Sequence, residues 1–197
     1  NIIKPILRGR DIKRYYYEWA GLWVIIAKFG FYKESHLYPS IVQHLTKYEE
    51  QLKNRGQCKY NRQNKVNINK DYTGQHHWLE LDNNPNENYL KEFEKEKVVW
   101  AETDQSFNTV IVPSCMYLQK TCFMIITKIP KIINAFLNSS IIQWYIRKRS
   151  SNLGEKGMSL TKQTVETIPI PPITSSNQHI VSQIESLVDK ILAAKKT

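Results

Sequence analysis

Residues 97–149, KVVWAETDQSFNTVIVPSCMYLQKTCFMIITKIPKIINAFLNSSIIQWYIRKR, decide the fold class of this chain. Three runs in this stretch, at 97–100, 109–113 and 121–127, are rich in β-branched and aromatic residues and predict short strands. From Pro130 onward, apolar side chains recur at helical spacing as far as Ile146, which predicts a helix with one buried face. Short strands followed by helices indicate an α+β fold.

The helical stretch also contains a predicted break and a predicted end. Asn138, Ser139 and Ser140 interrupt its apolar face, so we expect two consecutive helices. The stretch closes on Arg147-Lys148-Arg149, where positive charge suits the negative end of the helix dipole. This triplet therefore has a structural explanation as well as a candidate role in binding an anion.

Toward the N-terminus the sequence predicts a further strand and helix. Gly21 and Gly30 enclose LWVIIAKF, an apolar run typical of a strand. A helix should begin at Pro39 and end near Gly56, because its apolar residues are spaced by three and four positions: Ile41, Leu45, Tyr48 and Leu52.

The middle of the chain is more polar. The Asn- and Lys-rich segment 57–75 predicts a long exposed loop or a poorly ordered hairpin. Residues 78–81, WLEL, predict a short strand, and the following DNNPNEN predicts a turn.

The C-terminal part combines a stiff segment with a last helix. Residues 168–173, IPIPPI, must be extended because proline restricts its own φ angle and the conformation of the residue before it. Ser176 or Asn177 can then cap a helix whose apolar residues follow 4-3-4 spacing: Ile180, Ile184, Leu187 and Ile191. We expect a mixed sheet of short strands packed with helices at 1–174, and an amphipathic helix at 175–197 that packs on that domain or on a partner.

Charge gives the first indication of function. Of 197 residues, 41% are hydrophobic and 11% aromatic, which is typical of a folded protein, and 28 Lys and Arg against 18 Asp and Glu leave a net charge of +10. Residues 1–75 carry 14 basic and 6 acidic groups, residues 76–105 carry 3 and 8, and residues 106–197 carry 11 and 4. Two basic blocks flanking an acidic one suit a face that binds a polyanion, although a solvated surface explains any single block.

Cysteines and hydropathy indicate the compartment. Cys58, Cys115 and Cys122 include no C-x-x-C pair, so neither a disulfide framework nor a zinc ribbon is suggested, and a reducing cytoplasm is expected. The longest apolar run spans residues 22–27, far short of the ~20 residues that cross a membrane. No signal peptide is seen at Asn1, and we expect the sequence to be a fragment of a longer protein.

No motif of the sequence predicts catalysis or a metal site. Asn84-Pro85 begins like the N-P-P-aromatic loop of adenine methyltransferases, but Asn86 and Glu87 follow, so a turn is expected. Asp11-x-Lys13 lacks the Pro-Asp that would complete a nuclease metal site. His76-His77 lacks ligands at metal spacing, and no glycine-rich phosphate loop follows a strand.

Basic residues interleaved with aromatics and amides are the remaining chemical signal. Arginine can bond guanine or phosphate through paired N–H groups, and Asn and Gln can pair with adenine. The alternative is that the arginines pin an N-terminal strand through carboxylates or carbonyls. The densest cluster lies before three tyrosines: Arg8, Arg10, Lys13 and Arg14, then Tyr15, Tyr16 and Tyr17.

Seven blocks together resemble one family, the TaqI-like C-terminal specificity domain of adenine-N6 DNA methyltransferases and type IIG restriction-modification enzymes. The blocks occur in family order and cover nearly the whole chain: 4–19, 38–55, 77–81, 93–102, 117–127, 135–145 and 160–173. The closing IPIPP and helix are also similar to the ends of recognition domains in type I specificity subunits. This chain departs from the family in its longer link between Arg55 and Trp78.

The resemblance implies a target-recognition domain that is not an enzyme on its own. Its partners would be double-stranded DNA and an upstream methyltransferase domain, in some members preceded by an endonuclease. S-adenosylmethionine and Mg²⁺ are expected in those domains and not in this chain.

Candidate DNA contacts follow from the basic clusters and this resemblance. Base-edge contacts are expected from Arg10, Arg62, Asn64 and Lys156, and phosphate contacts from Arg8, Lys13, Arg14, Arg147, Lys148 and Arg149. Lys59, Lys65 and Lys162 complete the candidate set. The tryptophans Trp78, Trp100 and Trp144 are expected in the core rather than as stacking platforms.

Two alternatives remain open from the sequence. The first is a protein-interaction module or specificity subunit that docks a methyltransferase partner through the last helix. The second is a small complete enzyme that acts on nucleic acid.

Overall fold

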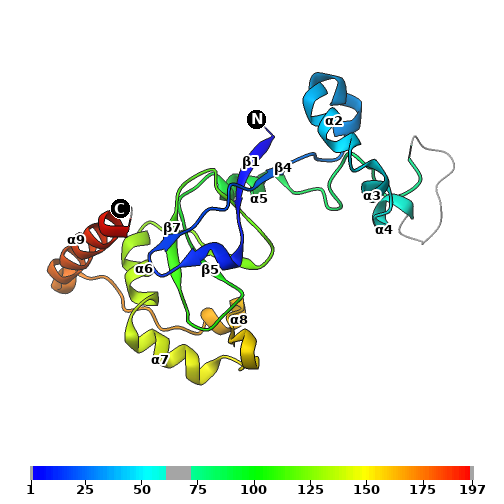
Figure 1. The fold of residues 1–197 in the computed structure, drawn as a ribbon. Coiled ribbons are helices and arrows are strands. Elements are labelled where there is room, and N and C mark those ends of the chain that lie inside the picture. The colour runs from blue at the N-terminus through cyan, green and yellow to red at the C-terminus, as the bar shows by residue number, and fades with distance from the viewer. Residues whose placement is uncertain (1, 61–71, 196–197) are drawn as a thin grey trace. The chain divides into compact units, whose positions relative to one another are not determined.

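The computed structural model describes residues 2–60 and 72–195 and has the α+β fold predicted from the sequence (Figure 1). The chain forms two compact units. The small unit comprises Asn1–Ile3 and Ile25–Tyr89, and the large unit comprises Lys4–Val24 and Leu90–Thr197. Most of the predicted loop at 57–75 lies outside the described residues.

A three-stranded antiparallel sheet forms the centre of the large unit. Its order is β7-β5-β9, with β5 at Lys97–Ala101, β7 at Thr109–Val112 and β9 at Cys122–Ile125. All three strands confirm the prediction. Every residue of β5 is buried because this central strand lies between two apolar clusters, with alternate side chains in each.

Helices α6, Pro130–Leu137, and α7, Ser140–Arg149, confirm the predicted helical stretch and its break. The break has a specific cause. The Asn138 amide pairs with β7, donating to the Thr109 carbonyl at 2.9 Å and accepting from the Thr109 N–H at 3.1 Å. Ser139 then caps α7 by accepting from the Ile142 N–H.

The predicted C-terminal helix is α9, Gln178–Lys195, which is preceded by a 3₁₀ turn, η4, at Ser175–Asn177. It contacts α6, where Lys131 and Asp189 form an ion pair at 2.7 Å. Val181 and Val188 are its buried apolar residues, whereas Ile180 and Leu187 are exposed. The helix therefore packs on its own unit through a stripe that includes Val181 and Val188 and shares the partly buried Ile184 and Ile191 with the predicted 4-3-4 stripe.

Shorter elements complete the large unit. Strands β1, Ile3–Leu7, and β8, Tyr117–Leu118, pair in parallel, and β4, Trp23–Ile25, joins the β1 edge. The strand predicted between Gly21 and Gly30 is thus shorter than expected: it ends at Ile25, and Gly30, with a φ angle of 95°, precedes a new helix. The remaining elements are η1 Gly9–Asp11, β2 Ile12–Lys13, β3 Tyr16–Tyr17, β6 Thr103–Asp104, η3 Gly154–Lys156, β10 Met158–Ser159 and α8 Lys162–Val165.

The small unit consists mainly of short helices: α1 Phe31–Glu34, η2 Ser35–Leu37, α2 Pro39–Thr46, α3 Glu49–Lys53 and α4 Gly56–Lys59. A single helix from Pro39 to Gly56 was predicted, but the chain breaks at Lys47 and Tyr48. The Thr46 hydroxyl donates to the Val42 carbonyl at 2.8 Å, and the next two N–H groups donate three residues back, which ends the α-helical pattern.

The strand predicted at 78–81 is wrong, and the turn predicted at 82–88 holds for residues 82–86. Residues 78–81 form no strand, because the Glu80 carboxylate accepts from the backbone N–H groups of Gly30 and His77 and fixes a turn. The predicted turn DNNPNEN runs into a helix, α5, at Glu87–Phe93. The Asn86 side chain accepts from the Asn88 N–H at 2.8 Å and so acts as its cap.

Among the described residues, no helix is long and apolar enough to cross a membrane.

Candidate functional site

The turn after β1 gives Arg8 a structural role. Its Nε and Nη2 atoms donate to the Asp11 carboxylate at 2.7–3.1 Å, and its backbone N–H also donates to Asp11. Burial alone would raise the pKa of Asp11, which is 3% exposed, but the hydrogen bonds from Arg8 hold that pKa below its usual value. Arg8 therefore holds the turn closed, as the alternative of arginines pinning the N-terminal strand predicted.

Arg10, two residues later, lies in a different environment. Its side chain is exposed, and its guanidinium forms no hydrogen bond or ion pair with any described residue. The neighbouring Gly9 is packed so tightly that a Cβ atom there would lie 3.1 Å from the Thr121 carbonyl. Lys13 donates to the Arg10 carbonyl at 3.1 Å. The turn thus presents Arg10 on a rigid backbone with its charge available.

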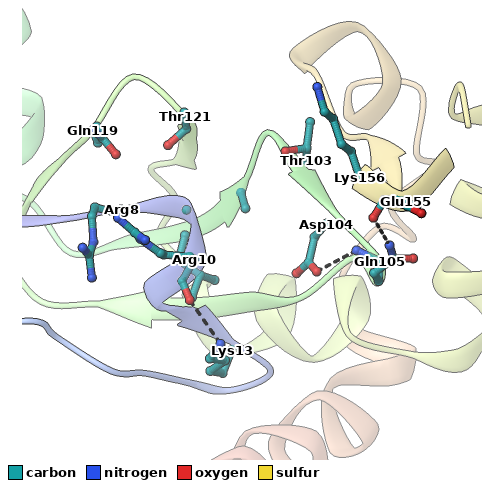
Figure 2. A pocket seen from close by; sticks show the side chains of 13 residues that line it. Arg8, Arg10, Lys13, Thr103, Asp104, Gln105, Gln119, Thr121, Glu155 and Lys156 are labelled. Carbon is teal, nitrogen blue, oxygen red and sulfur yellow. Dashed lines mark hydrogen bonds between the residues drawn. The ribbon is translucent and has the colours of Figure 1, made fainter. Parts of the chain in front are cut away.

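A cavity of about 470 Å³ opens beside this turn, and Figure 2 shows the side chains that line it. Four of them are basic: Arg8, Arg10, Lys13 and Lys156. Polar groups that can donate or accept line the rest, among them Gln105, Gln119 and Thr121. Two carboxylates, Asp104 and Glu155, also line it, so the cavity is not uniformly positive. We name it the turn cavity.

Gly157 allows the segment that carries Lys156 to lie beside the turn cavity. Gly157 has a φ angle of 88°, and a Cβ atom there would lie 2.3 Å from the Asp104 carbonyl oxygen. The Gln105 side chain donates to the Glu155 carbonyl at 2.6 Å and ties the two segments together (Figure 2). Only glycine permits this approach of η3 to the Asp104 backbone without strain.

A second cavity, of about 400 Å³, lies at the start of α7 and contains the next arginine of the N-terminal cluster. Arg14 donates to the Asn138 carbonyl at 2.9 Å, which the break between α6 and α7 leaves available. Arg147 and Trp144 contribute from α7, and Asn108 and Gln143 supply amides. We name it the α7 cavity.

The other predicted residues lie outside these two cavities. Lys148 is exposed, Arg149 lies over the Tyr145 ring at 5.3 Å, and Lys162 is 3.9 Å from Glu166. Lys59 belongs to the small unit, where it lines a cavity with Lys53 and Trp78. Arg62, Asn64 and Lys65 lie outside the described residues. The structure thus groups Arg8, Arg10, Lys13 and Lys156 together, and Arg14 with Arg147.

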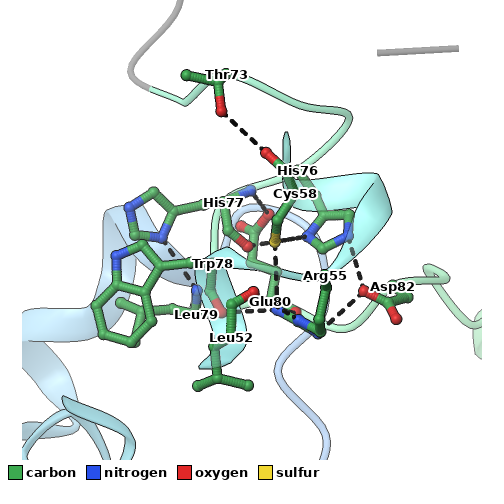
Figure 3. Close-up of polar contacts among 10 residues, drawn as sticks. All are labelled: Leu52, Arg55, Cys58, Thr73, His76, His77, Trp78, Leu79, Glu80 and Asp82. Carbon is green, nitrogen blue, oxygen red and sulfur yellow. Dashed lines mark hydrogen bonds and ion pairs between the residues drawn. The ribbon is translucent and has the colours of Figure 1, made fainter. Parts of the chain in front are cut away.

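The small unit has a buried polar cluster that resembles a catalytic arrangement (Figure 3). His76 is 1% exposed, with Nδ1 lying 3.6 Å from the Cys58 Sγ atom and Nε2 lying 3.2 Å from Asp82. Burial raises the pKa of Cys58, which keeps the thiol protonated and unsuited to nucleophilic attack.

Arg55 gives this cluster its structural purpose. Its guanidinium donates to the carbonyls of Trp78 and Glu80, each at 2.8 Å, and pairs with Asp82 at 3.1 Å (Figure 3). These bonds fasten α4 to the turn at 78–82, so the cluster holds the small unit together.

Trp144, which lines the α7 cavity, was not among the predicted site residues. Trp100 is buried at 3% exposure, as predicted, but Trp144 is 62% exposed and the prediction that it lies in the core is wrong. Helical spacing could have found this, because Trp144 lies two residues from both buried Ile142 and buried Ile146, on the opposite face of α7.

Comparison with known proteins decides the family. The model of the TaqI-like C-terminal specificity domain matches residues 4–170. The chain belongs to this family. The match includes every residue that lines the turn cavity and the α7 cavity. A specificity domain is not itself catalytic, and membership points to recognition of a DNA target in restriction-modification enzymes. A search of curated proteins gave no match.

Proposed function

We propose that this chain recognises a specific double-stranded DNA sequence and positions it for an adenine methyltransferase domain of the same polypeptide. The observation that carries the proposal is the family match over residues 4–170, since that segment supplies both basic cavities of the large unit. The methyl donor S-adenosylmethionine, and Mg²⁺ where a nuclease is fused, would be bound by those other domains. Type IIG architecture and a cytoplasmic location belong to the same proposal.

The basic side chains differ in how they are held, which supports different contacts with DNA. Exposed Arg10 and Lys156 suit base edges, because neither guanidinium nor ammonium is held by another described residue. Lys13, Arg14 and Arg147 suit phosphates, with Arg14 already oriented by the Asn138 carbonyl. Arg8 would support the turn rather than bind DNA directly, because Asp11 occupies its guanidinium.

Binding of labelled duplex DNA at several salt concentrations tests the proposal. Binding selection from random duplexes first supplies the preferred sequence. The logarithm of the affinity for it should then fall by ~0.9 for each phosphate neutralised, per tenfold increase in salt. Arg10→Ala should cost about 1–3 kcal/mol and relax the choice of one base pair. Affinity that does not respond to salt, or no sequence preference after selection, would contradict the proposal.

One observation favours a second candidate, docking of a methyltransferase partner through α9. Ile180 and Leu187 are 47% and 56% exposed and lie seven residues apart on α9, beyond the segment that the family model matches. The double variant Ile180→Ser/Leu187→Ser should leave DNA affinity unchanged, whether or not α9 docks a partner. Loss of association with a co-expressed methyltransferase domain would support the docking role.

A further inference from the structure

The outward face of α7 carries an aromatic residue that the packing of the unit does not use. Trp144 is 62% exposed, and its indole N–H has no hydrogen-bond partner among the described residues. On the same helix, Ile142 is 3% exposed and Ile146 is fully buried. Because the Trp144 indole is not packed against the unit, its face can stack on a flat ring of a ligand.

The groups around Trp144 are cationic and polar. Arg14 and Arg147 line the α7 cavity with it, and no carboxylate does so in the described part of the chain. Ser106 and Ser140 add hydroxyl groups. The turn cavity, by contrast, contains both Asp104 and Glu155. The α7 cavity is therefore the more favourable of the two for an anion.

Several of these side chains are already held in place. Gln143 exchanges two hydrogen bonds with the Phe107 backbone, at 3.0 and 2.6 Å. Arg14 is held by the Asn138 carbonyl, and Asn108 donates to Asp104 at 3.0 Å. Groups fixed before binding lose little conformational entropy when a ligand arrives.

We propose that Trp144 is a stacking platform for a nucleobase of the bound DNA that has left the base stack, with Arg14 and Arg147 on the flanking phosphates. This inference rests on the proposed function. An indole face stacks on any base, and the two arginines that line this cavity can donate paired hydrogen bonds to phosphates. Trp144 would thereby stabilise DNA that is locally opened.

A fluorescently labelled duplex with one unpaired adenine, beside the fully paired duplex of the same sequence, provides the test. Trp144→Ala should weaken binding of the duplex with the unpaired base roughly 5- to 150-fold, and Trp144→Phe should retain most of the affinity. The salt dependence should be unchanged in Trp144→Ala, because stacking releases no counterions. In Arg147→Ala the salt slope should fall by about 1.

Trp23→Ala is the matched control, since Trp23 is 58% exposed, lies in the large unit and lines neither cavity. Its binding should stay within about twofold of wild type if stacking is specific to Trp144. Equal binding by wild type and Trp144→Ala would overturn the stacking role alone and leave a protein partner as the use of this face. Failure of the wild-type chain to bind any duplex would overturn the proposed function as well.

Discussion

Different kinds of interaction stabilise the large unit and the small unit of this protein. The large unit has two apolar clusters on either side of β5, with buried side chains such as Val98, Phe107 and Leu137. Among the described residues, the buried members of the small unit's apolar cluster are Ala27, Phe31 and Leu79, and Arg55 and Glu80 form polar bonds between its segments. Apolar burial is non-directional and cumulative, whereas a polar cluster fails when one member is lost. The large unit is thus the more robust scaffold, and it carries both candidate cavities.

Shortening a buried apolar side chain of the large unit should have the largest effect on stability. That effect should be confined to the large unit. Leu137→Ala, at a site 1% exposed, is expected to lower the free energy of unfolding by about 2–5 kcal/mol. Amide hydrogen exchange should accelerate in β5 and α6 and stay unchanged in α2 and α3. Exposed Leu37 in the small unit provides a control as Leu37→Ala. Equal acceleration in both units would show that they unfold together and would break the comparison.

In the small unit, the charge of the Glu80 carboxylate should contribute most to stability. Glu80 is 3% exposed and accepts from the N–H groups of Gly30 at 2.6 Å and His77 at 3.0 Å. Glu80→Gln keeps the shape but replaces charge-assisted hydrogen bonds with weaker neutral ones at a cost of about 1–3 kcal/mol, so exchange should accelerate around α1 and 76–82. Exposed Glu50→Gln is the control. Unchanged exchange in Glu80→Gln would mean that apolar packing holds this unit too.

The large unit contains a fully buried amine, that of Lys97, which should make its stability depend on pH. Lys97 is fully buried, and its Nζ donates to the carbonyls of Phe93 and Lys95, each at 2.8 Å, and of Pro113 at 3.2 Å. Burial lowers the pKa of Lys97 from 10.5 to about 8. Above pH 8 the folded chain therefore binds fewer protons than the unfolded chain, and stability should rise with pH.

Urea unfolding at pH 7.5 and 9 measures this effect. The wild type should gain roughly 1 kcal/mol relative to Lys97→Met across this range, since Lys97→Met has no amine to titrate. Lys95→Met, which changes an exposed amine nearby, should follow the wild type. A parallel pH dependence in wild type and Lys97→Met would contradict the assigned pKa.

The smallest effect is expected from an exposed ion pair. Lys162 and Glu166 lie 3.9 Å apart on the surface of the large unit. Lys162→Ala should change the free energy of unfolding by less than about 0.5 kcal/mol and leave the DNA salt slope unaltered, since Lys162 lines neither cavity. A lower salt slope in Lys162→Ala would extend the DNA-binding surface to α8.

Sequence patterns predicted those elements whose structure depends on local spacing. Strands β5, β7 and β9 and helices α6, α7 and α9 follow from apolar runs and periodicity. The strand predicted at 78–81 does not form, because the Glu80 carboxylate accepts from the backbone of Gly30, 50 residues earlier in the chain. A local sequence pattern carries no information about such a distant contact. The candidate site was also predicted only in part. The sequence identified the basic residues, but only the folded turn shows that Asp11 holds Arg8 and leaves Arg10 available to a ligand.

Hydrogen exchange of the whole chain with and without duplex DNA tests the central claim most directly, because it locates the DNA on one of the two units. We predict protection in 9–14, 103–108 and 140–156, the segments that line the turn cavity and the α7 cavity. Protection confined to residues 25–89 would contradict the account.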